Sequence, residues 1–364
     1  MTRPASRRFG AARVALILAV VCLTSIGIAS PASAQGNTKF VRPGQSIQAA
    51  IDAAHPGDRI LVRHGTYAEQ LTIDKDGIDL IGLGATLVPP PSAAHNECSD
   101  LAGPGTQAGI CLQGTGIDLA DYVIEHRKVR SVDRPVKDVL ITGFQVRGFS
   151  GENIAVVGAR DARVIGNRLT DGERYGFLTA GSNNTLVAGN TVASATALRF
   201  IGICMDDRAG SKVSDNRISG YSTAICVQTP GGIVRHNEVR DSCYGAFVDP
   251  GVDGAKILDN HIAGTNPGCA TSDTPFAVGI DLYGAINTLV RHNRIEGQTV
   301  GGLPDGYAAG VLVFDVGTAV ASGNVVTQNV LRNNDLDLAA LSVGTGNVFS
   351  GNSCTTSEPL GLCG

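Results

Sequence analysis

The stretch VRHNEV, Val234 to Val239, places an Asn between a short apolar segment and a β-branched residue, and this arrangement recurs along the chain. The other instances are VIGNRL at Asn167, VAGNTV at Asn190, VSDNRI at Asn216, LDNHI at Asn260, VRHNRI at Asn293, ASGNVV at Asn324 and FSGNS at Asn352. Counted along the chain, with Asn237 in its place, successive Asn residues lie 23, 26, 21, 23, 33, 31 and 28 residues apart. Such regular spacing indicates a repeat protein.

Each repeat consists of strand-length segments rich in Val and Ile, broken by Gly, Asn and Asp, without a sustained helical pattern. A unit of this size cannot bury its apolar face alone, so successive units must stack into a solenoid. The 47 glycines fit the many tight turns that such stacking needs. We expect the recurrent Asn residues to form a ladder in which each side chain bonds to the backbone or to the Asn of the next coil.

The segment VRPGQSIQAAIDAAHPGDRILVRHGTYAEQLTI, Val41 to Ile73, resembles the N-terminal entry of secreted right-handed parallel β-helix proteins of the pectate-lyase-like superfamily. The resemblance implies an all-β fold, a right-handed parallel β-helix with coils of roughly 21–33 residues. A short helix would cover its N-terminal end with Ile47, Ala50, Ile51 and Ala54. It implies little about function, because this superfamily holds lyases, hydrolases, epimerases and proteins with no known chemistry.

Residues 1–34 have the layout of a secretory signal peptide: four arginines, then the apolar run Val14 to Ile28, then Ala32-Ser33-Ala34. The run is shorter than the roughly 20 apolar residues that span a bilayer, so we expect a secreted protein without a membrane span. Residues 35–364 then form a single β-helix domain, expected to be a monomer. Removing four arginines changes the formal charge from -4 to -8, which argues against a nucleic-acid partner.

Eight cysteines remain after residue 34, and an even number in an exported protein indicates disulfides. Proximity in the sequence favours the pairs Cys98 with Cys111, Cys204 with Cys226, Cys243 with Cys269, and Cys354 with Cys363. Only two methionines are present, so a copper-handling role like that of some periplasmic β-helix proteins lacks ligands.

The strands that precede each recurrent Asn can be aligned, and side chains alternate between the two faces of a strand. Two columns are expected to point inward. The first holds Phe177, Ile203, Ile225, Ala246, Ile280 and Val311, and the second holds Thr179, Met205, Val227, Val248, Leu282 and Val313. The first outward column holds Leu178, Cys204, Cys226, Phe247, Asp281 and Leu312, and the second holds Ala180, Asp206, Gln228, Asp249, Tyr283 and Phe314. Cys204 and Cys226 then lie on neighbouring coils, close enough for a disulfide or for simple contact.

Enzymes that this chain resembles commonly bind sugar polymers along this outward sheet. The resemblance implies a polysaccharide lyase or C5-epimerase acting on a uronate-containing glycan, with calcium held by Asp206, Asp249 and Asp281. Arg208 is the candidate base beside Asp206 and Asp249. Substrate-binding candidates are Gln228, Tyr283, Phe247 and Phe314.

Two alternatives stay open. Asp206 and Asp249, two coils apart, could serve as the two carboxyls of an inverting glycoside hydrolase. The chain could instead be a non-catalytic β-helix that binds a glycan or a cell-surface partner, since Asp and Asn are common at turns after strands. Pro89 to Lys128, Gly264 to Ala277 and Gly297 to Ala308 depart from the repeat, and such loops often carry binding sites.

Overall fold

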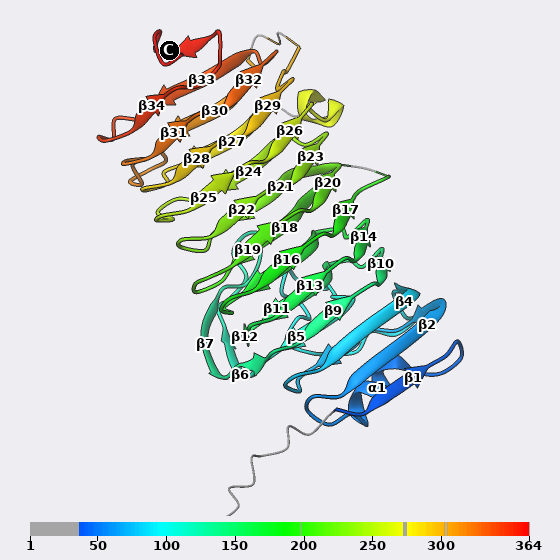
Figure 1. Cartoon of the computed structure of the whole chain (residues 1–364). Coiled ribbons are helices and arrows are strands. Elements are labelled where there is room, and N and C mark those ends of the chain that lie inside the picture. The colour runs from blue at the N-terminus through cyan, green and yellow to red at the C-terminus, as the bar shows by residue number, and fades with distance from the viewer. Residues whose placement is uncertain (1–35, 197, 272–274, 302, 304, 364) are drawn as a thin grey trace, which may run out of the picture. The chain divides into compact units, whose positions relative to one another are not determined.

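The structure, a computed structural model, describes residues 36–196, 198–271, 275–301, 303 and 305–363. The proposed signal peptide lies outside the described residues. Residues 35–364 form one compact unit, in which the strands of each coil pair in parallel with the strands of the next coil (Figure 1). This winding confirms the all-β, right-handed parallel β-helix. Within the described residues, no helix has the length and apolar character that a membrane crossing requires.

Three columns of strands enclose the core. The first holds β9 (Leu140–Thr142), β13 (Arg163–Ile165), β16 (Leu186–Ala188), β19 (Lys212–Ser214), β22 (Ile233–Arg235), β25 (Lys256–Leu258), β28 (Leu289–Arg291), β31 (Val325–Thr327) and β34 (Val348–Ser350). The second holds β10 (Gln145–Arg147), β14 (Arg168–Thr170), β17 (Thr191–Ala193), β20 (Arg217–Ser219), β23 (Glu238–Arg240), β26 (His261–Ala263), β29 (Arg294–Glu296) and β32 (Val330–Arg332). Both columns join one 20-stranded sheet through β1 (Thr38–Val41), β2 (Arg59–Ala68) and β4 (Asp79–Val88).

The third column is an 11-stranded sheet. It holds β3 (Leu71–Ile73), β5 (Ile110–Gln113), β11 (Glu152–Val157), β15 (Tyr175–Ala180), β18 (Arg199–Asp206), β21 (Tyr221–Val227), β24 (Tyr244–Val248), β27 (Phe276–Tyr283), β30 (Tyr307–Phe314), β33 (Leu336–Leu341) and β35 (Ser357–Glu358). Smaller elements are α1 (Ile47–Asp52), β6 (Thr115–Leu119), β7 (Val129–Arg134), β8 (Val136–Lys137), β12 (Ala159–Arg160) and the 3-10 helix η1 (Pro267–Thr271).

The predicted Asn ladder lies at the turn between the first and second columns. The Asn237 Oδ1 atom accepts bonds from both the backbone N–H and the Nδ2 of Asn216, each 3.0 Å long. The Nδ2 of Asn237 donates to Asn260 Oδ1 at 3.0 Å and to the Val213 carbonyl at 3.0 Å. The residue before each ladder Asn has a positive φ, for example 54° at His236, which makes the turn tight. The ladder therefore satisfies buried polar groups on every coil.

The assignment of Asn324 to this ladder is wrong. Asn293 bonds to Asn329, 36 residues later, and Asn329 bonds to Asn352, 23 residues later. Asn324 instead lies before β31 and accepts from the Thr288 backbone N–H at 2.9 Å. The segment GNVVTQNVL contains two Asn residues with similar flanks, and only the strand register distinguishes them. The coils thus extend to 36 residues, beyond the predicted upper limit of 33.

The core consists of stacked Val, Ile and Leu side chains, such as Val234 and Ile257 on adjacent coils, which are fully buried. Burying each side chain of this kind stabilises the fold by roughly 1.5–3 kcal/mol. The predicted cap is confirmed: α1 directs Ile47 and Ile51 into the N-terminal end of this core. Ser46 accepts from the Ala49 N–H at its N-terminus, so the short helix is held in place.

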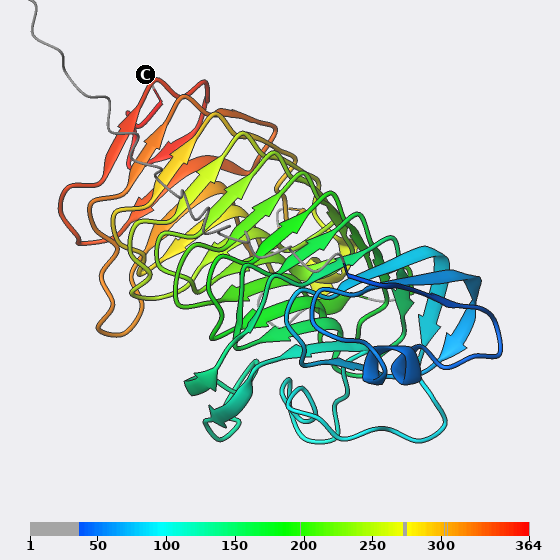
Figure 2. The same cartoon turned by 60° about the horizontal axis from the view of Figure 1, so that its bottom comes forward.

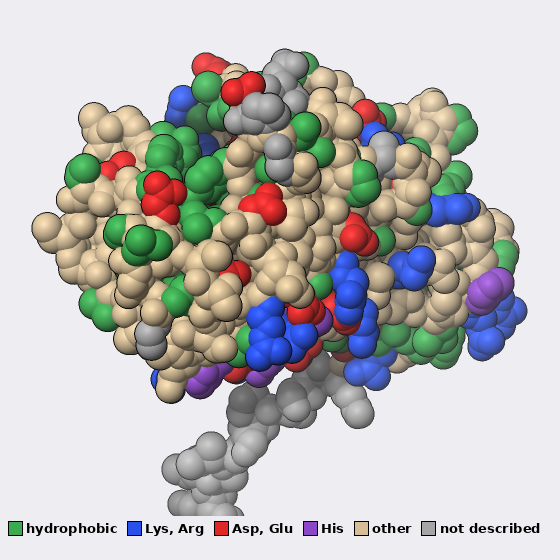
Figure 3. Space-filling model, turned by 90° about the horizontal axis from the view of Figure 1, so that it is seen from above, with side chains coloured by type: hydrophobic (Ala, Val, Ile, Leu, Met, Phe, Trp, Pro, Cys, Tyr) green, Lys and Arg blue, Asp and Glu red, His purple; other side chains and the backbone are tan. Residues whose placement is uncertain are grey.

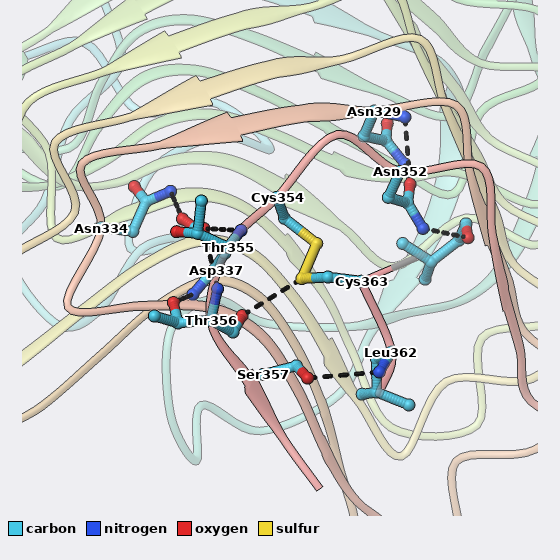
Figure 4. Close-up of a disulfide and its surroundings, with 11 residues drawn as sticks. Asn329, Asn334, Asp337, Asn352, Cys354, Thr355, Thr356, Ser357, Leu362 and Cys363 are labelled. Atoms are coloured by element: carbon cyan, nitrogen blue, oxygen red, sulfur yellow. Dashed lines mark hydrogen bonds between the residues drawn. A yellow bond between two sulfur atoms is a disulfide. The ribbon is translucent and has the colours of Figure 1, made fainter. Parts of the chain in front are cut away.

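A second closure lies at the C-terminal end, where the Cys354–Cys363 disulfide joins the last segment to the coil before it (Figure 4). Buried Asp337 accepts bonds from the Thr355 N–H at 2.8 Å and from its hydroxyl at 3.0 Å. Leu362 donates its N–H to the Ser357 hydroxyl at 3.2 Å. These bonds fix the end of the solenoid where no further coil follows in the described chain.

Candidate functional site

The side of the 11-stranded sheet that points away from the core, called the outer face, carries the candidate site. Its register confirms the predicted columns: Ala180 pairs with Asp206, Phe247 with Asp281, and Tyr283 with Phe314. The predicted inward residues are buried in the core, with Thr179 among them. Alternation along each strand therefore places the candidate residues together on one surface.

All four predicted disulfides are present: Cys98–Cys111, Cys204–Cys226, Cys243–Cys269 and Cys354–Cys363. Cys204 and Cys226 are register partners on β18 and β21, so this bridge joins two neighbouring coils on the outer face. Four bridges in one chain fit an oxidising compartment outside the cytoplasm.

A segment far away in the sequence contacts Asp206. The antiparallel pair β6 and β7 and their connection, residues 115–134, are called the hairpin arm, and Figure 2 shows it projecting from the coils. The Asp206 Oδ2 atom lies 3.0 Å from His126 Nε2 and 3.1 Å from Lys128 Nζ. The other ring nitrogen of His126 lies 3.1 Å from the Tyr175 hydroxyl, and this His is 2% exposed. The arm thus holds two nitrogen groups against one carboxylate oxygen.

Gln228, on the next coil, also contacts the hairpin arm. Its Nε2 donates to Glu125 Oε2 at 2.7 Å, and its Oε1 accepts a short bond from Lys128. One coil further, the Asp249 Oδ2 atom lies 3.7 Å from Cys226 Sγ. Burial and the nearby charge of Glu125 raise the pKa of Asp249 to about 7, although Gln228 and Lys128 oppose this shift. Asp249 therefore exchanges a proton near neutral pH.

The two residues after Asp206 differ from it in position. Asp207 is buried and accepts bonds from the Thr179 hydroxyl at 2.7 Å and the Ser182 N–H at 3.1 Å. It ties the turn after β18 and faces away from the outer face. Arg208 is exposed, and its backbone N–H donates to the Ser182 carbonyl. Within the described chain, the basic side chains that contact Asp206 are Lys128 and the imidazole of His126, and Arg208 forms no ion pair with it.

Aromatic rings cover the other part of the outer face, over β24, β27 and β30. Tyr283 and Phe314 stack with their rings 9° apart and their centroids 5.8 Å apart, and Phe276 and Tyr307 stack at 5.8 Å. The ring centroids of Phe247 and Tyr283 lie 5.4 Å apart. Hydrophobic side chains also gather on one side of the face that Figure 3 shows, whereas most of its Lys and Arg side chains lie elsewhere. Such ring pairs offer flat apolar surfaces.

These rings line a pocket of about 420 Å³, called the aromatic pocket. Its aromatic residues are Tyr244, Phe247, Phe276, Tyr283, Tyr307 and Phe314, and Asp281, Leu312 and Leu341 complete it. Asp281 is 2% exposed, and burial together with the charge of Asp249 raises its pKa to about 8. The pocket has the size and the mainly apolar lining of small-ligand sites.

The three aspartates expected to hold calcium do not suit it. Within the described residues, no group of three or more His, Cys, Asp or Glu side chains could hold a metal ion. Asp206 contacts two nitrogen groups, and the raised pKa values of Asp249 and Asp281 favour their protonated forms. Calcium requires several ionised or neutral oxygens that converge on one point. We therefore derive no step through calcium.

The residues that the sequence reasoning missed are Glu125, His126, Lys128 and Tyr175. His126 and Lys128 lie 80 and 100 residues from their partners Asp206 and Gln228. They belong to the Pro89 to Lys128 excursion, which has no repeat period, so no pattern related it to a column of strands. The available signal was the expected Cys98–Cys111 disulfide within this excursion, which indicates an ordered loop.

Two family models match parts of the chain. Residues 201–362 match the right handed beta helix region family, and residues 92–272 match the periplasmic copper-binding protein family. Copper binding, which the second family's name mentions, is a property of that family. The side chains of this protein do not suit copper either. The eight cysteines of residues 35–364 form disulfides, and the described residues contain no cluster of three or more His, Cys, Asp or Glu side chains that could hold a metal.

Solved structures share the fold at low sequence identity. An alginate lyase from Paenibacillus sp. str. FPU-7 is 17% identical, with 80% of this chain and 95% of that chain covered and a TM-score of 0.53. A polygalacturonase from Erwinia carotovora ssp. carotovora is 12% identical, with 92% and 97% covered and a TM-score of 0.56. The search of curated proteins found no match. The chain thus has the right-handed parallel β-helix of the pectate-lyase-like fold.

Proposed function

We propose that this protein is an exported carbohydrate-active enzyme that binds a polysaccharide along the outer face and hydrolyses it with Asp249 and Asp206. The observation that carries the proposal is the contrast between these two carboxyls. Asp206 faces Lys128 and His126, whereas burial raises the pKa of Asp249 to about 7. Two carboxyls in such different environments are suited to the roles of base and acid.

The proposed mechanism assigns the proton of Asp249 to the glycosidic oxygen that leaves. Asp206 takes a proton from a water molecule that attacks the opposite face of the sugar ring. The two residues lie on strands two coils apart, so their backbones are about 9.6 Å apart by strand spacing. Inverting glycosidases hold their carboxyls roughly 6.5–9.5 Å apart, which leaves room for that water. The proposal therefore includes inversion at the anomeric carbon.

The hairpin arm positions this pair. Lys128 contacts both Asp206 and Gln228, and His126 is itself fixed by the Tyr175 hydroxyl. Gln228 lies between the proposed acid and base in the second outward column, and its side chain donates a hydrogen bond to Glu125. These contacts keep the Asp206 carboxylate in one orientation and define one side of the groove for the polymer.

A lyase or epimerase acting on a uronate remains a second candidate because Lys128 offers a cation on the outer face. Its side chain is 51% exposed and lies beside Asp206, so it could neutralise a uronate carboxylate without calcium. Asp249, with a pKa of about 7, could then exchange the proton at the carbon next to that carboxylate. The fold of the alginate lyase is compatible with this candidate.

The test incubates the protein, without residues 1–34, with a panel of neutral and uronate polysaccharides, each with calcium and with a chelator. Reducing ends, unsaturated products and exchange of ring protons are followed separately. New reducing ends of inverted configuration without unsaturation support the hydrolase. Unsaturated products support the lyase, and proton exchange without cleavage supports the epimerase. Absence of all three on every substrate would sink the enzyme proposal and leave a glycan-binding protein.

A further inference from the structure

We propose that the aromatic pocket is a subsite for one uncharged pyranose unit of the polymer. This inference deepens the proposed function and rests on it for the polymer, while the binding it predicts can be measured alone. It differs from the expectation of a polyuronate, because a sugar carboxylate would find no cation in this pocket.

Two polar atoms in the pocket lack a partner. Among the described residues, Asp281 Oδ1 and the Tyr307 hydroxyl are buried and form no hydrogen bond. Both residues line the pocket, and burial, followed by the charges of Glu358 and Asp281, raises the pKa of Tyr307 to about 12. Buried polar groups are normally paired, so a ligand that brings hydroxyl groups would satisfy atoms that the protein leaves unpaired.

The rest of the lining suits the C–H face of a sugar ring. The Tyr283 and Phe314 rings stack nearly parallel, and both line the pocket together with these polar residues. A pyranose combines apolar C–H faces with hydroxyls at its rim, which matches the flat rings and the two polar atoms. The pocket volume of about 420 Å³ lies within the range for small-ligand sites.

Charge decides against an acidic sugar at this position. Among the described residues, the lining contains no Lys, Arg or His, and its one carboxyl is that of Asp281. A uronate carboxylate here would lose water beside another carboxyl with no opposite charge to compensate. The cations of the outer face lie near Asp206 instead, where Lys128 could contact an acidic unit.

Continuity with the proposed catalytic pair favours a sugar of the same polymer over an unrelated ligand. Phe247 pairs with Asp281 in the sheet, and Asp249 follows Phe247 by two residues on the same face. Val248 pairs with Leu282, so Asp249 and Tyr283, the next residue on each coil, are neighbours in the same outward column. The pocket thus begins on the coil of the proposed acid, at Phe247, and extends over the next coils, where the next units of a bound chain would lie.

The test uses matched pairs of tetrasaccharides: oligomers of galacturonate, mannuronate, guluronate and glucuronate, and the same oligomers after reduction of their carboxyl groups. Members of a pair differ only at C6. The protein has seven Tyr and no Trp, so quenching of tyrosine fluorescence reports occupancy of a pocket that contains three of them. Calorimetry gives the dissociation constants.

At pH 7, at least one reduced member should bind about tenfold or more tightly than its acidic counterpart. Tyr283→Ala and Phe314→Ala should weaken that binding by about tenfold, since they remove the stacking surface. Phe40→Ala, at an exposed ring on β1, is the matched control and should change nothing.

Acidic members that bind at least as well in every pair would overturn the inference, as would no binding by any probe. An unchanged affinity in Tyr283→Ala would do the same. If sedimentation shows a dimer that Tyr283→Ala abolishes, the pocket is covered by a second copy and the inference fails. Binding that persists without turnover in the polysaccharide panel would refute the proposed hydrolase and leave this subsite intact.

Discussion

The outer face has two halves that share one strand register and differ in chemistry. The polar half, Asp206, Gln228 and Asp249, is contacted by the hairpin arm, whereas the aromatic half, over β24 to β33, forms the aromatic pocket. Each half contains a carboxyl with a raised pKa, Asp249 and Asp281. Asp249 lies among groups that can exchange protons, whereas Asp281 lies among rings. Burial is the largest cause of both raised pKa values, and the neighbours decide what each carboxyl can do.

The largest expected effect is on catalysis in the polar half. Asp249→Asn removes the proton donor, so kcat should fall by about 10²- to 10⁴-fold while KM changes little. Steady-state kinetics on the best substrate of the panel measures both constants. Asp215→Asn is the matched control: this residue is exposed and has a φ of 57°, which Asn tolerates, so it should keep full activity. An equal loss in the control would remove the assignment.

The next effect is on stability in the aromatic half. Because the folded-state pKa of Asp281 is about 8 and its ordinary value is 3.8, its contribution to stability is present below about pH 4 and is lost by about pH 8. Asp281→Asn should abolish this part of the pH dependence, which we expect to be roughly 2–5 kcal/mol. Urea unfolding at pH 5 and pH 9 measures it. The same slope in the variant and the wild type would show that Asp281 does not titrate as described.

A smaller effect is expected from the ring surface. Tyr283→Ala should raise KM by about tenfold with kcat nearly unchanged, because it removes a contact made equally in the ground state and the transition state. The same kinetic assay separates the two constants. A fall in kcat with unchanged KM would instead place Tyr283 at the reacting bond. It would contradict the assignment of catalysis to the polar half and of substrate binding to the aromatic half.

The smallest effect is expected at the hairpin arm. Lys128→Met removes a half-exposed contact to Asp206, and such pairs contribute little, so kcat/KM should fall only about two- to fivefold. Added salt should shrink the difference between variant and wild type. Lys212→Met, at an exposed lysine on β19, is the control. A far larger loss, insensitive to salt, would make Lys128 a direct participant.

The sequence was sufficient to predict the strand columns and the disulfides. Side chains alternate with period two along a strand, so Asp206, Gln228 and Asp249 could be aligned on the outward face from the sequence alone. Cys204 and Cys226 followed from the same alignment. The N-terminal cap was also predicted, because Ile47 and Ile51 share one helical face.

The partners of the columns could not be predicted in the same way. His126 and Lys128 reach Asp206 from an excursion without period, and contacts across 80 or more residues depend on how that loop folds. Asn324 and Asn329 have similar local sequences, and only pairing with the previous coil distinguishes them. Burial of Asp281 also depended on rings from two other strands, β24 and β30, and on Leu341 of β33, which line the same pocket.

The most direct test of the division into halves is a crystal structure of the Asp249→Asn variant with an uncleaved oligosaccharide from the panel. The account predicts a chain along the outer face, with a glycosidic bond between the carboxyl of Asp206 and residue 249 and an uncharged ring against Tyr283 and Phe314. An oligosaccharide bound on either column of the 20-stranded sheet, or one whose acidic unit fills the aromatic pocket, would contradict it.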